Sequence, residues 1–316
     1  MEDVSKVHAL LGEHGRLGAL ERLPQPIGDD DRRVLEIAAA FMGDERVGSQ
    51  GFLYSGWCLT SLPHRRILDS EAWRLDNGGI TLLVEPGRRI LRSGEDVFCG
   101  VPFGATARLI LIFLQSEALR NKSRNVELGS SMRRWLSRLG KEASGGKTAR
   151  LVRDQALRIS TCKFSFHGHL NGSRGVANQT IVDNAILWDD EDERQSSLFV
   201  EGVTLSEGFY KALTEHAVPL EERALRHISD SSLALDVYAW LAYRLHAIGG
   251  EVNVSWTALR GQFGRAFKDM DDFKPKFRKA LRAALAVYPE AAEKGVTESK
   301  RGLTLRPTRP PVLPRR

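Results

Sequence analysis

Hydrophobic and polar residues follow one another along this chain in an order that occurs twice. Long apolar helices are expected at 103–120, FGATARLILIFLQSEALR, and at 231–249, SSLALDVYAWLAYRLHAIG. The second of these begins at a serine cap and stops at a glycine. After each helix, the spacing predicts a short extended segment, two further helices and a pair of strands. We therefore expect the chain to contain two copies of one structural unit.

The first copy continues from its long helix into a short strand, NVEL, at 125–128. A helix is expected at 130–139, followed by a glycine turn and another helix at 147–160. Two alternating segments, 162–170 and 179–190, flank the turn sequence NGSRG. This pattern predicts a β-hairpin after the three helices.

The second copy has the same order. Its strand is expected at 252–256, its helices at 256–264 and 271–288, and its hairpin at 293–307 with the turn near Glu298–Gly302. Helix, strand, helix, helix and hairpin is the order of a winged helix, a helix-turn-helix variant whose third helix enters the major groove of DNA. The pattern therefore predicts two winged-helix domains.

The region before the two copies has a different pattern. DDDRRVLEIAAAFMG, at 29–43, predicts a capped helix, and 51–66 and 80–90 are β-rich with turn residues between them. The expected fold class is α+β, mostly helical, with two winged-helix (helix-turn-helix) domains after a small β-rich N-terminal region. The expected domains are a weakly ordered leader (1–28), an N-terminal helix plus β-rich region (29–98), the first winged-helix domain (99–204), a linker helix with the second winged-helix domain (205–312) and a basic tail (313–316).

Composition excludes several classes of protein. Of 316 residues, 42 % are apolar and 27 % are charged, which is typical of a folded protein with a sizeable core. The longest apolar run, LILIFL at 109–114, is too short to span a bilayer, and the first residues lack the pattern of a signal peptide. The three cysteines are far apart and form no CxxC pair, which favours a reducing compartment. We expect a cytoplasmic protein with no membrane partner.

Positive charge is concentrated in two segments. Residues 120–160 carry eleven Lys and Arg against three Asp and Glu, and residues 251–316 carry fifteen against seven. The net charge of the whole chain is only +6, so the rest of the chain is acidic. Each basic segment contains the predicted third helix of one copy. This coincidence indicates two surfaces for a polyanion such as DNA.

The predicted helix at 271–288 separates apolar from basic side chains. Phe273, Phe277 and Leu281 recur every four residues and are expected to face the core. Ala283 and Ala286 leave the opposite face slim enough to approach base edges, which arginine can bond bidentately. The same charges also suit an ordinary solvated helix. In the DNA-binding interpretation the contacting residues are Lys274, Lys276, Arg278, Lys279 and Arg282, with Lys300 and Arg301 in the following hairpin.

The helix at 147–160 carries the other basic face. Gly145 and Gly146 leave free N–H groups at its N-terminus beside Lys147, which is a natural site for a phosphate. Arg150 and Asp154 are also spaced for an ordinary ion pair along the helix. The residues expected to contact the DNA backbone are Lys147, Arg150 and Arg158 on this helix, and Arg133, Arg134 and Arg138 on the preceding one.

The glycines of LGKEASGGKTAR, at 139–150, do not form a nucleotide-binding loop. Such a loop requires Gly, four residues and then Gly-Lys-Ser/Thr, after a buried strand. Here Gly140 and four residues reach Gly145, and Gly146 intervenes before Lys147. The preceding sequence also predicts a helix rather than a strand. We therefore expect no ATPase activity.

A second catalytic motif is the pair His167-Gly168-His169. Origin-nicking enzymes use two histidines around a hydrophobic residue to bind a metal near a nucleophilic tyrosine, a role that Tyr210 could take. The middle residue here is glycine. Strand alternation places Phe164 and Phe166 on the buried face and Lys163, Ser165, His167 and His169 on the exposed one, where histidines are usually only polar.

Several long blocks resemble a single family. They are, in order, GFLYSGWCLTSLPHRR, ITLLVEPG, VPFGATARLILIFLQSEALR, VELGSSMRRWLSRLG, GGKT, and ALDVYAWLAYRLH followed by VSWTALRGQFG. Together they resemble the plasmid-encoded RepA family of replication initiators, from about residue 51 to about residue 312. Residues 1–28 and 186–197 contribute nothing to this resemblance.

The resemblance implies a plasmid initiator that binds double-stranded origin DNA, often at repeated sites, and helps host replication proteins, a helicase or an initiator, to open the origin. Initiators of similar architecture use two winged helices per chain, the second as the main base reader. Some dimerise and repress their own gene. The resemblance supplies no catalytic residues, so we expect a non-enzymatic protein with no cofactor or metal, associated with the bacterial nucleoid or plasmid. The alternative is a winged-helix transcriptional regulator with no role in replication.

Overall fold

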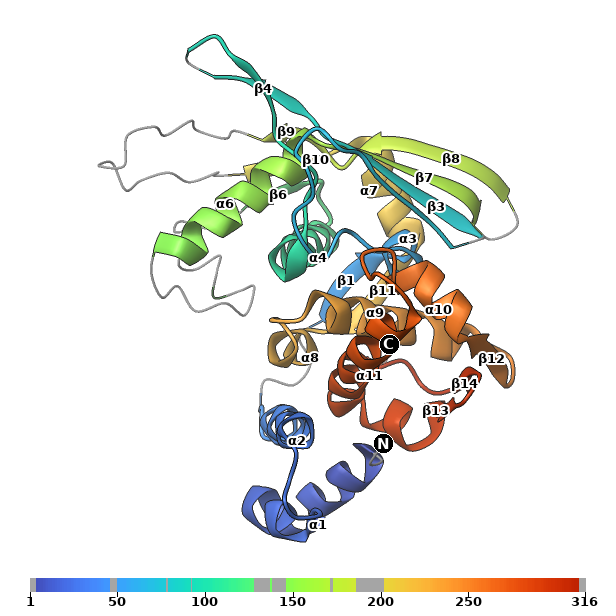
Figure 1. Cartoon of the computed structure of the whole chain (residues 1–316). Coiled ribbons are helices and arrows are strands. Elements are labelled where there is room, and N and C mark those ends of the chain that lie inside the picture. Colours follow the sequence, from blue (N-terminus) through green and yellow to red (C-terminus); the bar gives the residue numbers. More distant parts are fainter. Residues whose placement is uncertain are drawn as a thin grey trace. The chain divides into compact units, whose positions relative to one another are not determined.

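The computed structural model describes residues 4–45, 50–77, 79–91, 93–127, 137, 146–170, 173–185 and 202–312 (Figure 1). The chain divides into two units. The central unit is Phe52–Ala217, and the terminal unit consists of Met1–Gly51 and Val218–Arg316. Both units mix helices and strands, which confirms the predicted mixture of α and β structure. Among the described residues, no helix combines the length and the apolar character needed to cross a membrane.

The central unit contains most of the strands. Its elements are α3 (Ser55–Leu59), β2 (Trp73–Asp76), β3 (Ile80–Glu85), β4 (Arg88–Ile90), β5 (Asp96–Phe98), α4 (Gly104–Arg120), β6 (Asn125–Glu127), α6 (Gly146–Thr161), β7 (Lys163–Leu170), β8 (Ser173–Thr180), β9 (Val182–Ala185), β10 (Gly202–Leu205) and α7 (Glu207–Glu215). The chain passes between the units within β1 (Gln50–Tyr54) and β11 (Ala217–Glu221).

Helix α4 is the centre of this unit because it is apolar on all sides. Its buried polar residues also have partners. The Gln115 side chain accepts a hydrogen bond from the Tyr54 backbone at 2.7 Å and donates one to the Leu111 carbonyl at 2.8 Å. Ser116 accepts a bond from the Phe52 backbone at 2.7 Å. These bonds satisfy polar groups that would otherwise be costly to bury, and those from Phe52 and Tyr54 fix α4 to β1.

The strands after α6 pair differently from the sequence prediction. β7 and β8 form a hairpin, but β7 also pairs with β3, in a four-stranded sheet of order β2-β3-β7-β8. β6 pairs instead with β10, which pairs with β9. The predicted hairpin of 162–170 and 179–190 is therefore wrong in its second strand. β8 begins at Ser173, inside the predicted turn, and β9 follows as a separate strand.

Aromatic packing explains why β7 joins the other sheet. Phe164 and Phe166 pack edge to face on Trp57 of α3, with ring centroids 5.6 and 5.0 Å apart. Gly168 lets β7 and β3 approach closely, because a Cβ there would lie 2.4 Å from the Gly79 carbonyl oxygen. These partners are distant in sequence, and local alternation cannot reveal which strand lies beside which.

The C-terminal part of the terminal unit has the predicted element order. After α8 (Glu222–His227) come α9 (Ser232–Ala247), β12 (Val252–Ser255), α10 (Trp256–Phe263), α11 (Met270–Ala286), a π-helical turn (Ala291–Gly295), β13 (Val296–Ser299) and β14 (Gly302–Leu305). The three strands form an antiparallel sheet of order β12-β14-β13, with Leu303 and Leu305 of the middle strand buried.

Side-chain caps start the three helices of this part where the sequence changes from polar to apolar. Ser231, Ser255 and Asp269 each accept a hydrogen bond from a backbone N–H in the first turn of α9, α10 and α11. The core beneath these helices is aromatic. The ring centroid of Phe277 lies 5.5 Å from that of Phe263 and 5.2 Å from that of Phe273. The predicted apolar face of α11 is thus buried in this core.

Residues 4–22, which the sequence predicts to be a weakly ordered leader, form helix α1 (Val4–Arg22). It packs on α2 (Asp29–Met42), and both helices contact α11 within the terminal unit (Figure 1). Val4, Val7 and Leu11 provide its buried stripe. The prediction failed because the glycines of this segment lower intrinsic helix propensity, while packing against neighbouring helices overrides it.

Candidate nucleic-acid surface

Helix α11 carries the basic residues predicted for DNA contact in the terminal unit. Asp269 caps its N-terminus by accepting a bond from the Asp272 N–H at 2.8 Å. The helix begins at Met270, so Pro275 lies in its second turn. It therefore removes one helical hydrogen bond near the N-terminal end of the surface.

Two basic residues of α11 stack on an aromatic ring of α10. The Lys274 ammonium and the Arg278 guanidinium lie 5.5 and 5.2 Å from the ring centre of Trp256. Arg278 also donates a hydrogen bond to Glu298 of β13 at 2.7 Å. These contacts hold both cations at the junction of α10, α11 and the β13–β14 hairpin. Trp256 and Glu298 were not among the predicted site residues, because their role depends on packing between distant segments.

Lys276 lies on the exposed side of the same half of the helix. Its ammonium pairs with Asp272 one turn earlier and lies 5.3 Å from the ring centre of Phe267. Such a surface pair is weak, because both groups remain largely hydrated. Lys276 is therefore available to an anionic ligand that outcompetes Asp272.

The C-terminal half of α11 differs from the prediction. Ala283 and Ala286, expected on a slim outward face, are 7 % and 0 % exposed. Lys279 pairs with Asp30 of α2 at 2.6 Å, and Arg282 pairs with Asp31. The small alanines that suit a close approach to DNA also suit close packing of helices, and α1 and α2 occupy that face. The prediction that Ala283 and Ala286 form an outward face is wrong, although Lys279 beside them is half exposed.

The turn between β13 and β14 presents the last two predicted residues of the terminal unit. Lys300 and Arg301 are both exposed. The Arg301 N–H donates to the Ser299 hydroxyl, and the Arg301 carbonyl accepts a bond from the Trp256 N–H at 3.1 Å. Gly302 has a φ of 151°, and a Cβ there would lie 2.0 Å from the Val254 carbonyl oxygen, so the tight turn requires glycine.

In the central unit, α6 presents its N-terminal turn. Lys147 and Arg150 are exposed there, as predicted. Gly146 is the first residue of the helix as described, so Lys147 lies in the first turn, where the N–H groups have no partner within the helix. Gly145 and the predicted contacts Arg133, Arg134 and Arg138 lie outside the described residues.

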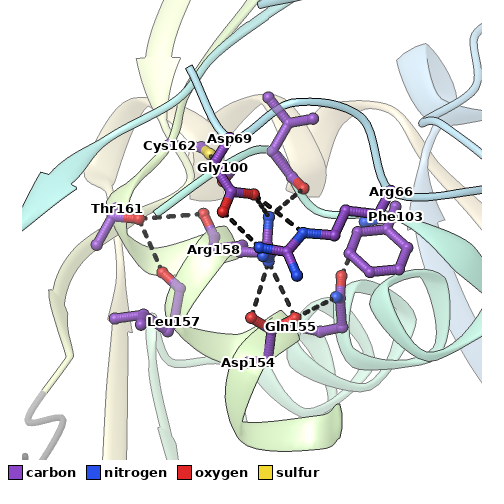
Figure 2. Close-up of polar contacts among 11 residues, drawn as sticks. Arg66, Asp69, Gly100, Phe103, Asp154, Gln155, Leu157, Arg158, Thr161 and Cys162 are labelled. Atoms are coloured by element: carbon purple, nitrogen blue, oxygen red, sulfur yellow. Dashed lines mark hydrogen bonds and ion pairs between the residues drawn. The ribbon is translucent and has the colours of Figure 1, made fainter. Parts of the chain in front are cut away.

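Arg158 was expected on the same exposed face of α6, and the structure corrects this (Figure 2). Its side chain is 4 % exposed. Its guanidinium donates to both carboxylate oxygens of Asp154 at 2.9 Å, to Asp69 at 3.0 Å and to the Val101 carbonyl at 3.3 Å. The group also lies 5.3 Å from the ring centre of Phe103. Arg158 is therefore buried inside the unit and cannot reach a DNA phosphate.

The residues around Arg158 fix α6 to the rest of the central unit (Figure 2). Asp69 bonds Arg66 as well as Arg158, and these two guanidinium groups hold the pKa of Asp69 below its ordinary value. Gln155 accepts a hydrogen bond from the Phe103 N–H at 2.8 Å. These contacts fix the C-terminal half of the helix and leave its first turn exposed. The spacing of Asp154 and Arg158 was the available signal for the buried pair.

Of the two catalytic motifs, His167-Gly168-His169 lies on β7, and most of the glycine-rich segment 139–150 lies outside the described residues. His167 is half-buried on β7, and Ser165, expected on the exposed face, is 2 % exposed. The His169 side chain lies outside the described residues. Within the described part of the chain, no group of three or more His, Cys, Asp or Glu residues could hold a metal ion.

The sequence model of the family of plasmid-encoded RepA proteins matches residues 101–258, half of the chain. The chain belongs to the plasmid-encoded RepA family of replication initiators. The predicted resemblance is thus confirmed for these residues. The match runs from the segment before α4 into α10, and α1, α2 and α11 lie outside it.

Two crystal structures of RctB are similar to this RepA-family chain. One contains domains 2 and 3 in selenomethionine form, with 14 % sequence identity, a TM-score of 0.49 and coverage of 72 % of this chain and 83 % of that one. The other contains RctB 155–483, with 15 % identity, a TM-score of 0.46 and coverage of 72 % and 81 %. No curated protein sequence matches the chain.

Proposed function

We propose that this RepA-family chain is a non-enzymatic initiator that binds specific double-stranded sites, repeated within a plasmid origin, through two winged helices. The observation that carries the proposal is the arrangement of α9, α10 and α11 with the sheet β12-β14-β13. A long core helix, a helix pair and a hairpin beside the third helix is the arrangement of a winged helix. In the central unit, α4, α6 and the sheet β6-β10-β9 have the corresponding order.

The N-terminal half of α11 is proposed as the base reader. Lys274 and Arg278 lie together over Trp256, and Lys276 lies near Phe267 on the same half of the helix. Arg278 is 42 % exposed, and Glu298, at 2.7 Å, is its carboxylate partner among the described residues. Arginine can bond the O6 and N7 atoms of guanine bidentately, which gives it a preference among bases. Glu298 and Trp256 hold the side chain beside the hairpin and so limit its freedom before DNA arrives.

The exposed turns are proposed to bind the phosphate backbone. Lys300 and Arg301 lie at the tip of the β13–β14 hairpin, next to the reading helix. Lys147 and Arg150 lie at the start of α6, where first-turn N–H groups without partners in the helix and the helix dipole favour an anion. Contacts of this kind fix the register of a protein on DNA without selecting a sequence.

Recruitment of host replication proteins, a helicase or an initiator, and repression of the chain's own gene are also part of the proposal. They rest on membership of the RepA family, as does a dimer for the repressing form. Recruitment and repression both require a protein that first recognises a particular duplex. Duplex recognition is therefore the step to test.

The test is fluorescence anisotropy of the full chain with duplexes tiled across the DNA that flanks its gene, in a series of salt concentrations. A scrambled duplex of equal length is the control. The proposal predicts tight binding confined to a few repeated segments, about 10³-fold or more above the scrambled duplex. Weak binding that ignores sequence and falls steeply with salt would contradict it, because phosphate contacts alone behave in that way.

A further inference from the structure

The acidic start of α2 lies against the basic face of α11. Asp30 pairs with Lys279 at 2.6 Å, and Asp31 pairs with Arg282, whose side chain is only 11 % exposed. Asp29, in the same turn, is exposed and forms no ion pair within the described part of the chain. Two of three consecutive carboxylates thus engage two cations that are one turn apart on α11.

A side chain of helix α1 contacts the backbone of α11 on the same face. The His8 ring nitrogen Nε2 lies 2.9 Å from the carbonyl oxygen of Ala286, which can only accept, so Nε2 carries the proton. This carbonyl is in the last turn of α11, where helical partners are absent. Between these polar contacts, Ala283 and Ala286 are buried. We call α1 and α2 together the acidic cover.

The position of the cover conflicts with DNA binding. Lys279, Arg282 and Ala286 lie opposite the buried Phe273 and Phe277 around α11, which is the side that a third helix of a winged helix turns to DNA. Aspartates at the first turn of α2 are also favoured by its helix dipole. The dipole explains their presence, but it does not explain why Asp30 and Asp31 face the cations of another helix.

We propose that the acidic cover is an autoinhibitory segment, in which the Asp30 and Asp31 carboxylates occupy the places of DNA acceptor groups on α11. The inference rests on the proposed function, because it assigns a regulator to the same helix. The initiator then exists in a covered form and an open form, and only the open form brings the whole face of α11 to the duplex. The apparent affinity of the chain equals the affinity of the open form multiplied by the fraction of chains that are open.

The cover is built so that it can leave. Lys279 and Asp30 are both half exposed, and exposed pairs of this kind hold weakly. The other attachments are the Arg282–Asp31 pair, the contact of His8 with the Ala286 carbonyl, and the packing of α1 and α2 on α11 and of α2 on α8. The phosphates and base edges of a cognate duplex offer Lys279 and Arg282 more acceptor groups than the two carboxylates do. A specific site can therefore displace the cover where a random duplex does so less often.

The test compares two full-length double variants with the wild-type chain. Asp30→Asn with Asp31→Asn removes both carboxylates that face α11. Asp29→Asn with Glu21→Gln removes the same total charge from exposed positions of the cover. Anisotropy is measured on one duplex that the wild type binds and on its scrambled version, and thermal unfolding verifies that both variants fold.

The inference predicts that Asp30→Asn with Asp31→Asn binds the cognate duplex about fivefold or more tightly than wild type, because more chains are open. The Asp29 and Glu21 control is expected to change affinity by less than about twofold. Hydrogen exchange of wild type saturated with the duplex is expected to show faster exchange of the amides in residues 4–42 than in the free protein.

Each contrary result has a distinct meaning. Equal affinity of wild type and the Asp30 and Asp31 variant, with unchanged exchange of residues 4–42 on the duplex, would show that the cover stays docked and would overturn the inference. An equal gain in both variants would reduce the effect to net charge and would also overturn it. If neither wild type nor the variants prefer any duplex to its scrambled version, the proposed function fails, and the inference fails with it.

Discussion

Arg158 and Arg278 carry the same guanidinium group in different surroundings. Arg158 is 4 % exposed and bonds two aspartates and a backbone carbonyl, whereas Arg278 is 42 % exposed and bonds Glu298. A buried charge depends on its partners, because an unpaired charge loses its hydration without compensation. A half-exposed charge can exchange a carboxylate for a DNA acceptor at small cost. Burial thus assigns Arg158 to the scaffold and leaves Arg278 available to a ligand.

At the residue scale, Arg158→Ala is predicted to destabilise the central unit. The change leaves Asp69 and Asp154 without their shared cation and is expected to cost about 3 kcal/mol of unfolding free energy. Urea denaturation of the full chain measures the loss. Arg150→Ala, on the exposed turn of the same helix, serves as the control and should stay within about 0.5 kcal/mol of wild type. Equal losses in both variants would contradict the structural role of Arg158.

The pKa of Asp69 gives a prediction about pH. Hydrogen bonds from Arg66, and further from Arg158, hold this pKa below its ordinary value. The ionised carboxylate therefore stabilises the folded chain above the unfolded pKa of about 3.9, and this contribution is lost as the pH falls through the lower folded pKa. Asp69→Asn should be less stable than wild type near neutral pH, and the difference should shrink on acidification. Melting temperatures from about pH 3 to pH 7 measure it, and a constant difference would contradict the prediction.

At the scale of elements, the first turn of α6 and the body of α11 are assigned different roles. Lys147 lies in the first turn of α6, where the backbone N–H groups have no partner within the helix and suit any phosphate. Arg278 stands between a helix and a hairpin, and its planar fork suits a base edge. The first contact should add affinity on every duplex, and the second should depend on sequence.

Lys147→Ala is therefore predicted to weaken binding by a similar factor on cognate and scrambled duplexes. The slope of log K against log salt should become shallower by roughly 1, because one phosphate contact is lost. Lys211→Ala, which removes an exposed charge from α7, is the matched control and should leave the slope unchanged. Anisotropy at several salt concentrations measures both. A loss confined to the cognate duplex would assign Lys147 to base reading instead.

Elements with strong local signals could be predicted, and those that depend on distant partners could not. The apolar repeat of Phe273, Phe277 and Leu281 revealed α11 and its buried face, and the serine cap at 231 revealed where α9 begins. The partner of β7 could not be predicted, because Trp57 and β3, which decide it, lie about 80 to 110 residues earlier in the chain. Helix α1 was missed because packing, not propensity, stabilises a segment that contains three glycines.

At the scale of the whole molecule, the distribution of charge along the chain indicated where a polyanion could bind. It did not reveal which cations are already neutralised. Arg158 lies in one basic segment and is buried by Asp69 and Asp154. Arg282 lies in the other and faces Asp31. Part of the acidic surplus outside the basic segments is thus paired with them, and only the tertiary structure shows where.

The central claim is that α11 reads bases, and Arg278→Lys tests it most directly. The substitution keeps a cation beside Glu298 and removes the bidentate fork. We predict that affinity for the cognate duplex falls by about 1–3 kcal/mol, while affinity for the scrambled duplex and the salt slope stay near those of wild type. The ratio of the two affinities would then fall. An unchanged ratio, with both affinities equal to those of wild type or reduced together, would show that Arg278 selects no base and would contradict the account.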